Sequence, residues 1–286
     1  MKTRISVRAL LVTVLLIVLS GCSAIQLGYR NADTLLHWRA GQYFDFQGEQ
    51  KAEFSQRVQR FLAWHRRTAL PQHARLANDM ADRLARGLKQ EDLVWGYDSF
   101  KVQLRQSLRS GSTEMVGLLD TLSPAQIEGF QARLDKENRK HARDYGLGET
   151  PDEQREKRVK RNVERLEDWF GGLSESQLER VRAYSARAPL DGAMRNRDRK
   201  RLQHELLAMI RGKGVRKHLV DWTVAWDQHR DPAYAAMLGA NLQEYYAMLL
   251  DLDRILSSEQ RGRAVQKLRD LARDFSILAA LDGGAR

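Results

Sequence analysis

Apolar side chains recur along most of this chain at the spacing of a helix. Phe54, Val58, Phe61 and Leu62 lie at i, i+4, i+7 and i+8, which places them on one helical face. The same spacing returns in Val159, Val163, Leu166 and Phe170, in Leu202, Leu206 and Met209, and in Val265, Leu268, Leu271, Phe275 and Leu278. No segment alternates apolar and polar residues between turn dipeptides, so strands are not indicated. The pattern predicts an all-α protein, an elongated multi-helix bundle of roughly nine to eleven helices that could form two lobes.

Short polar motifs predict where several of these helices begin. Residues 123–126 (Ser-Pro-Ala-Gln) place Ser at the N-cap, Pro at the first helical position and Gln at the third, which is a capping box. Residues 174–177 and 257–260 repeat the Ser-x-x-Gln spacing, and residues 150–153 give Thr-Pro-Asp-Glu. Asp231-Pro232 predicts one more helix start, and residues 46–50 carry a degenerate version. The motifs recur at irregular intervals, so they do not indicate a solenoid.

The first residues predict a secreted and lipidated protein. Lys2, Arg4 and Arg8 precede an apolar run over residues 9–19, which is too short for the roughly 20 residues of a bilayer-spanning helix. The run ends in Leu-Ser-Gly-Cys at residues 19–22, which resembles the lipobox of bacterial lipoproteins. The resemblance implies cleavage before Cys22, diacylglycerol on its thiol and acylation of its new amine. We therefore expect a signal peptide over 1–21, a lipidated tether over 22–32 and a helical domain over 33–286, with a sub-boundary near 146–151.

Composition and charge exclude several classes of protein and bear on the compartment. The chain has 286 residues, 42% of them hydrophobic, a net charge of +11 and a single cysteine. The apolar fraction is too high for a disordered chain, and one cysteine cannot build a disulfide scaffold or a multi-cysteine metal site. Without the three basic residues of the leader, the net charge is +8. Ser23 stands where an Asp would resemble an inner-membrane retention signal, so we expect an outer-membrane lipoprotein facing the periplasm. Nucleic acid is not an expected partner there.

Two resemblances extend this interpretation. Residues 35–39 (LLHWR), 43–45 (YFD), 64–71 (WHRRTALP) and 169–171 (WFG) resemble landmarks of a family of proteobacterial lipoproteins that is known only as a domain of unknown function. That resemblance implies a lipoprotein with one extended helical domain, and it supplies no activity or cofactor. The Leu-Ser-x-x-Gln boxes at residues 122, 173 and 256 are similar to the Leu-Thr-x-x-Gln motif of Spy/CpxP-type periplasmic chaperones. This second resemblance implies an all-helical, ATP-independent protein that cradles unfolded clients on a basic, partly apolar face.

An aromatic and basic cluster is the first candidate for a binding surface. One part of it, residues 64–67, lies just before Pro71, where we expect a helix to end and the cations to complement its negative end. The alternative is a binding surface, because Arg forks grip carboxylates or phosphates and Trp and Tyr supply contact area. The candidate residues of this surface are His37, Trp38, Arg39, Tyr43, Trp64, His65, Arg66 and Arg67.

Two basic tracts and one aromatic set have a simpler interpretation. The tracts are Arg155, Lys157, Arg158, Lys160 and Arg161, and Arg195, Arg197, Arg199, Lys200 and Arg201. Charged helix faces are normally solvated, and the alternative is attraction to anionic lipid, lipopolysaccharide phosphates or acidic clients. The aromatic set, for which we expect core packing, is Trp222, Trp226, Tyr234, Tyr245 and Tyr246.

Catalytic motifs are absent from the sequence. It has no His-Glu-x-x-His, no Gly-x-Ser-x-Gly and no phosphate-binding glycine loop. The seven His are scattered, and pairs such as His141 with Asp144 are ordinary helix neighbours. We expect no catalytic residue, metal or cofactor. The expected function is a non-enzymatic lipoprotein, held in the membrane by lipid on Cys22, that binds or scaffolds an envelope protein or an anionic lipid. The alternative is a Spy-like chaperone.

Overall fold

The computed structural model describes residues 24–281, so the predicted signal peptide and Cys22 lie outside the described residues. The chain order is α2 (Ala24–Arg30), α3 (Ala32–Phe44), α4 (Glu49–Trp64), the π-helical turn η1 (His65–Ala69), α5 (Leu70–Ala85), α6 (Gln90–Leu119), α7 (Pro124–Asp144), α8 (Pro151–Phe170), α9 (Glu175–Arg187), α10 (Gly192–Arg211), α11 (Val215–Val224), α12 (Pro232–Arg254) and α13 (Ser258–Ala280). The described chain contains no strand, which confirms the predicted all-α multi-helix bundle. Within residues 24–281, none of the helices combines the length and apolar composition needed to cross a membrane.

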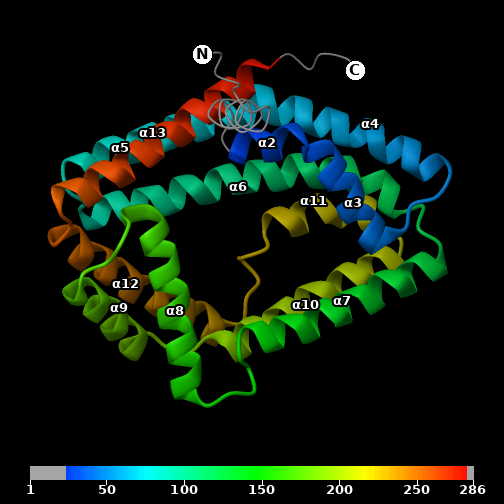
Figure 1. The fold of residues 1–286 in the computed structure, drawn as a ribbon. Helices are drawn as coiled ribbons and strands as arrows, with labels where there is room; N and C mark the ends of the chain where they lie inside the picture. Colours follow the sequence, from blue (N-terminus) through cyan, green and yellow to red (C-terminus); the bar gives the residue numbers. More distant parts are fainter. Residues whose placement is uncertain (1–23, 282–286) are drawn as a thin grey trace, which may run out of the picture.

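The helices form a ring in the view of Figure 1. The helices α4, α5, α6 and α13 lie along one side, and α7 and α10 lie along the opposite side. The group of α8, α9 and α12 closes one end, and α3 descends towards α7 at the other. One apolar core joins α3, α4, α6, α7, α10 and α11, and a second joins α8, α9 and α12. The predicted sub-boundary falls in the connection between α7 and α8, while the first core takes residues from both sides of it.

The predicted capping boxes all begin helices. At Ser123, Ser174 and Ser257 the side-chain oxygen accepts from the backbone N–H of the Gln three residues later, and that Gln accepts in return from the N-cap N–H. Thr150 and Glu153 make the same exchange, and the Asp231 carboxylate accepts from the N–H of Tyr234. Each box satisfies backbone donors that a helix start otherwise leaves without partners.

The glutamines of these boxes also join helices that are distant in sequence. Gln126 Nε2 donates to the carbonyl of Asp45 at 2.9 Å, and Gln50 Nε2 donates to the carbonyl of Thr121 at 3.0 Å. The two amides also bond each other at 2.8 Å, so the turn before α4 and the turn before α7 are tied together. We call this pair the first glutamine clasp. The degenerate motif at residues 46–50 is its second half.

A second glutamine clasp repeats this arrangement at the other end of the ring. Gln177 Nε2 donates to the carbonyl of Ile255 at 3.3 Å, and Gln260 Nε2 donates to the carbonyl of Gly172 at 2.9 Å. The amides bond each other at 2.7 Å. Gln177 is only 1% exposed, whereas Gln260 is partly exposed, so the clasp is buried on its Gln177 side. The turn before α9 and the turn before α13 are therefore fixed against each other.

The sequence predicted that a helix ends just before Pro71, and this prediction is wrong. Residues 65–69 continue the helix as a π-helical turn, in which the N–H of Leu70 donates to the carbonyl of His65, and α5 follows directly. Pro71 has no N–H to give to the carbonyl four residues earlier, and its ring would clash there. Widening the helix by one residue avoids the clash without breaking the chain of hydrogen bonds. The basic residues before Pro71 therefore lie within a continuous helix.

The helical body also begins earlier than predicted. Helix α2 starts at Ala24, inside the segment expected to be a tether, and it packs against the end of α13. Gln26 Nε2 donates to the Asp274 carboxylate at 2.8 Å, and both side chains are buried. Polar side chains that bond across 248 positions leave no pattern in a local sequence, so this start could not be predicted.

Candidate functional site

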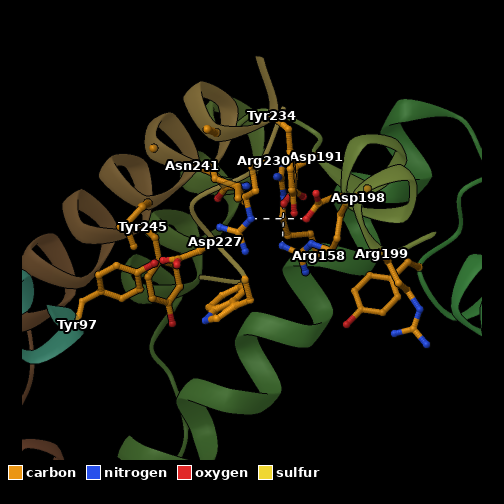
Figure 2. Close-up of a pocket in the computed structure, with 18 of the residues that line it drawn as sticks. Tyr97, Arg158, Asp191, Asp198, Arg199, Asp227, Arg230, Tyr234, Asn241 and Tyr245 are labelled. Atoms are coloured by element: carbon orange, nitrogen blue, oxygen red, sulfur yellow. Dashed lines mark hydrogen bonds and ion pairs between the residues drawn. The ribbon is translucent and has the colours of Figure 1, made fainter. Parts of the chain in front are cut away.

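A cavity of about 880 Å³ is the candidate functional site of the described chain. It lies between α6, α8, α9, α10, α12 and the connection from α11 to α12 (Figure 2). Its volume falls in the range of roughly 300–1,000 Å³ that is typical of ligand sites. The cationic side chains in its lining are Lys101, Arg158, Arg161, Arg165, Arg195, Arg199 and Arg230. Its carboxylates are Asp191, Asp198 and Asp227, and its aromatic residues are Tyr97, Tyr145, Tyr184, Trp226, Tyr234 and Tyr245.

Helical spacing explains why so many arginines meet here. Arg158, Arg161 and Arg165 lie at i, i+3 and i+7 on α8, so they share one face of that helix. Arg195 and Arg199 lie one turn apart on α10. The apolar side chains of α8 lie beside its arginines, and these apolar side chains pack into the second core. Burying the apolar side chains therefore directs the arginines towards the cavity.

Every carboxylate in the lining already has a cationic partner. Asp191 pairs with Arg195 at 2.7 Å. Asp198 pairs with Arg201 at 2.7 Å and with Arg230 at 3.6 Å. Asp227 pairs with Arg105 at 3.0 Å and with Lys101 at 3.9 Å. Each of these carboxylates is already paired with a cation, so none of them neutralises the other cations of the cavity.

Four guanidinium groups of the cavity have no carboxylate within 4.0 Å among the described residues, namely those of Arg158, Arg161, Arg165 and Arg199. Arg158 is held by protein carbonyls: it donates to Ser185 O at 2.6 Å, Ala188 O at 2.8 Å and Pro189 O at 2.9 Å. Burial lowers the pKa of its guanidinium. Because it caps the carbonyls at the end of α9, Arg158 is a structural cation.

The other three of these arginines keep donors available. Arg161 lies over the ring of Tyr145 at 5.2 Å, and Arg199 Nε donates to Asn138 at 2.9 Å. Arg165 is exposed, and no hydrogen bond or ion pair holds it within the described chain. A guanidinium carries five N–H donors, so one contact leaves most of them free for an anion.

Aromatic and cationic side chains are mixed in the lining. The end of the cavity at Tyr97 and Tyr245, which we call its aromatic end, also holds Lys101, which lies 5.2 Å over the ring of Tyr97. Figure 2 shows Tyr97 and Tyr245 at one end, Arg199 at the opposite end, and Arg158 and Arg230 between them. Arg230 lies 4.4 Å over the ring of Trp226, and its buried Nε has no hydrogen-bond partner in the described structure. The cavity therefore combines an apolar wall with unfilled cationic donors.

Three tyrosines of the cavity have a raised pKa. Burial raises the pKa of Tyr184, Tyr234 and Tyr245, although Arg158, Arg195 and Arg165 respectively oppose the rise. A phenol with its ordinary pKa of about 10 is already neutral at neutral pH, so these three side chains add no negative charge to the cavity. A neutral phenol can donate a hydrogen bond, and the Tyr184 hydroxyl donates to Asn241 at 2.9 Å.

The basic tracts differ from solvated faces, while the aromatic set largely packs as predicted. Arg158 is only 8% exposed, and Arg161, Arg195 and Arg199 line the cavity. Of the aromatic set, Tyr234 and Tyr246 are buried, and Trp222 and Tyr245 pack against the two cores. The members that also line the cavity are Trp226, Tyr234 and Tyr245. Neither Arg165 nor Arg230 belongs to the predicted basic tracts. The i, i+3, i+7 arginine stripe of α8 could have indicated the former.

The predicted aromatic and arginine surface is divided into two groups. His37 Nε2 contacts the Ser55 hydroxyl at 2.8 Å, and its ring meets Phe54. Tyr43 packs against Phe130 below Arg39, whereas Trp38 is 59% exposed. This first group lies along α3, away from η1.

The second group is centred on His65. Its Nδ1 lies 3.0 Å from the hydroxyl of Tyr29, and its ring contacts those of Trp64 and His73. Burial, followed by the charges of His73 and Arg66, lowers the pKa of His65 to about 4. Hydrogen bonds and ring contacts in residues 24–281 do not connect this group to the first. That the eight residues form one binding surface stays a prediction.

No group of three or more His, Cys, Asp or Glu residues in the described part of the chain could hold a metal ion.

The fold and the cavity define this chain as an all-α multi-helix protein with a cation-lined cavity. It belongs to a protein family whose description is "Family of unknown function (DUF6279)", and the family model matches residues 42–229, more than half of the chain. The matched region contains the α8 and α10 walls of the cavity, while α12 follows it. No curated protein and no solved structure matches the chain.

Proposed function

We propose that this chain is a non-enzymatic lipoprotein of the bacterial outer membrane, facing the periplasm, and that it binds an anionic envelope component in the cavity. The single observation that carries the proposal is the set of arginines whose charge no carboxylate of the described chain neutralises, beside an aromatic wall. Like charges gathered around one cavity repel one another, and a bound anion relieves that repulsion. A phosphate-bearing lipid or lipopolysaccharide fits, since guanidinium forks bind phosphate oxygens in pairs.

The membrane location in this proposal depends on the predicted signal peptide and on Cys22. Two or more acyl chains give stable anchoring, with each buried CH₂ adding about 0.8 kcal/mol. The chain's single cysteine stands at the position where a lipobox needs a thiol. In the predicted mature protein that thiol is consumed, so no free thiol is left to oxidise in the periplasm.

In-cell photocrosslinking tests this function. A photoreactive phenylalanine analogue at Tyr97, which is 40% exposed at the aromatic end of the cavity, should form a crosslink to a phosphate-bearing envelope component. The matched control carries the same analogue at Arg180, an exposed position of α9 outside the cavity lining. Identical products from both positions, or none from Tyr97, would contradict the proposal.

A Spy-like, ATP-independent chaperone is the second candidate. It is favoured by exposed apolar side chains on α6, where Val94 and Phe100 lie three residues on either side of Tyr97 and Val102 follows. Exposed apolar patches of this kind can hold unfolded clients. A chaperone of this type suppresses aggregation of an unfolded client at stoichiometric ratio. Absence of suppression rejects this second function and leaves the first intact.

A further inference from the structure

Exposed apolar side chains concentrate where the described chain begins. Of the eleven large hydrophobic residues that are exposed in residues 24–281, six lie on α2, on α3 or at the end of α13. They are Ile25, Leu27, Leu35, Trp38, Ile277 and Leu281. Figure 1 shows α2 beside the end of α13, and the two helices are in contact. The patch is therefore a local feature of one edge of the molecule.

Three of these side chains follow one another along α2 and α3. Leu35 and Trp38 lie three residues apart on α3, so they share one side of that helix. Leu27 lies on α2, which joins α3 at Asn31, and there the N–H of Asn31 donates to Leu27 O. We call the exposed side chains of Leu27, Leu35 and Trp38 the apolar stripe, while Gln26 and Ala40 of the same two helices are buried.

We propose that the stripe of Leu27, Leu35 and Trp38 lies on the membrane surface to which Cys22 is anchored, with lipid covering this face. The proposal rests on the proposed lipidation. The stripe begins five residues after Cys22, so acyl chains on that residue would hold these helices at the bilayer. An amphipathic helix in the plane of a membrane buries its apolar face at the boundary between headgroups and acyl chains. Trp is enriched at that depth, because its ring is apolar and its N–H is polar.

Charge beside the stripe favours a lipid surface over a protein partner. Arg30 and Arg39 are exposed, the first at the end of α2 and the second directly after Trp38 on α3. Basic residues beside a buried apolar face are attracted to anionic headgroups. A second copy of the chain would instead bring the same arginines together. Lipid therefore satisfies the stripe and the arginines beside it at the same time.

Site-directed spin labelling can test this contact in the full chain. Lipidation consumes the Cys22 thiol, so a nitroxide attaches only to an introduced cysteine. The lipidated protein would be extracted from cells and reconstituted into vesicles of phosphatidylethanolamine and phosphatidylglycerol, with L35C as the test and D33C as the matched control. Asp33 is exposed on the opposite side of the same helix. Since both positions are exposed, neither substitution removes a core side chain, and circular dichroism checks the fold.

We expect the label at position 35 to be several-fold more accessible to oxygen, and less accessible to a water-soluble nickel chelate, than the label at position 33. If the protein floats with the vesicles but both labels are equally accessible to the chelate, the membrane contact is wrong and the lipid anchor stands. A label at position 35 shielded from both relaxants indicates a protein partner and also overturns the contact. If the parent protein takes up label at Cys22 or fails to float, the lipidation is wrong, and the contact with it.

Discussion

Individual arginines around the cavity differ in what they contact, and this separates structural cations from those available to a ligand. Arg158 is buried and donates to three carbonyls at the end of α9. Arg165, two turns further along the same helix, is exposed and has no such contacts. Position on a shared face therefore does not give the two side chains a shared role.

Substitution of these two arginines should affect stability very differently. We expect R158A to lower the free energy of unfolding by about 2–4 kcal/mol, because it leaves buried carbonyls without a donor and removes the buried side-chain stem. R165Q should change it by less than about 0.5 kcal/mol, as for most exposed substitutions. Urea unfolding followed by circular dichroism measures both. Equal losses would show that the assignment of roles is wrong.

His65 predicts a dependence of stability on pH. Its pKa of about 4 in the folded protein lies below the roughly 6.5 of an unfolded chain. The unfolded state therefore takes up the proton first, and the contribution of His65 to stability is fully present above pH 6.5 and is lost as the pH falls towards 4. The groups that face it are Tyr29 from α2, His73 from α5 and the neighbouring Arg66.

The variant H65Q isolates this contribution, since it removes the titrating ring and leaves the carboxylates of the protein in place. We expect the difference in unfolding free energy between the parent protein and H65Q to be constant above pH 6.5 and to shift against the parent between pH 6.5 and 4. Urea titrations at several pH values measure it. A difference that does not change with pH would contradict the assigned pKa.

At the scale of elements, the sequence predicted where helices begin but not how their starts meet. Ser123 and Gln126 define a capping box from four consecutive residues, because the bonds involved are local. The same Gln126 side chain also bonds Gln50, 76 positions away, and nothing local encodes that contact. The π-helical turn at residues 65–69 escaped prediction for a similar reason: a Pro indicates a helix end, and here the preceding helix widens instead.

The second glutamine clasp should contribute strongly to the stability of the protein. We expect Q177A to lower the free energy of unfolding by about 2–3 kcal/mol, because it removes half of a capping box and the donor to Ile255 O, and leaves Gln260 without its partner. The control is Q106A, the same change at an exposed position of α6. A loss in Q177A no larger than in Q106A would mean that the clasp is dispensable.

At the scale of the whole molecule, the all-α bundle follows from periodicity, whereas the cavity follows from the path of the chain. Arg161 and Arg199 belong to tracts that the sequence predicted to be solvated. Only the ring of helices brings α8 and α10 to face α6 and α12 around one space. The predicted surface around His37 and Trp64 was argued from adjacency in sequence, and adjacency does not report which helices lie opposite each other.

We expect the positive charge inside the cavity, rather than the net charge of the protein, to hold the ligand. The double variant R161Q/R165Q removes two positive charges from the cavity without removing a core side chain. Its matched control, K160Q/R180Q, removes two positive charges from exposed positions of α8 and α9 outside the lining. The two variants have the same net charge, so any difference between them reports the site.

Native mass spectrometry of the lipidated protein, released gently from envelopes, measures this most directly. We expect the parent protein and K160Q/R180Q to carry a bound anionic component of defined mass, and R161Q/R165Q to lose it at least tenfold. Equal retention by all three proteins, or a parent protein that carries no ligand, would contradict the central claim that this cavity is an anion-binding site.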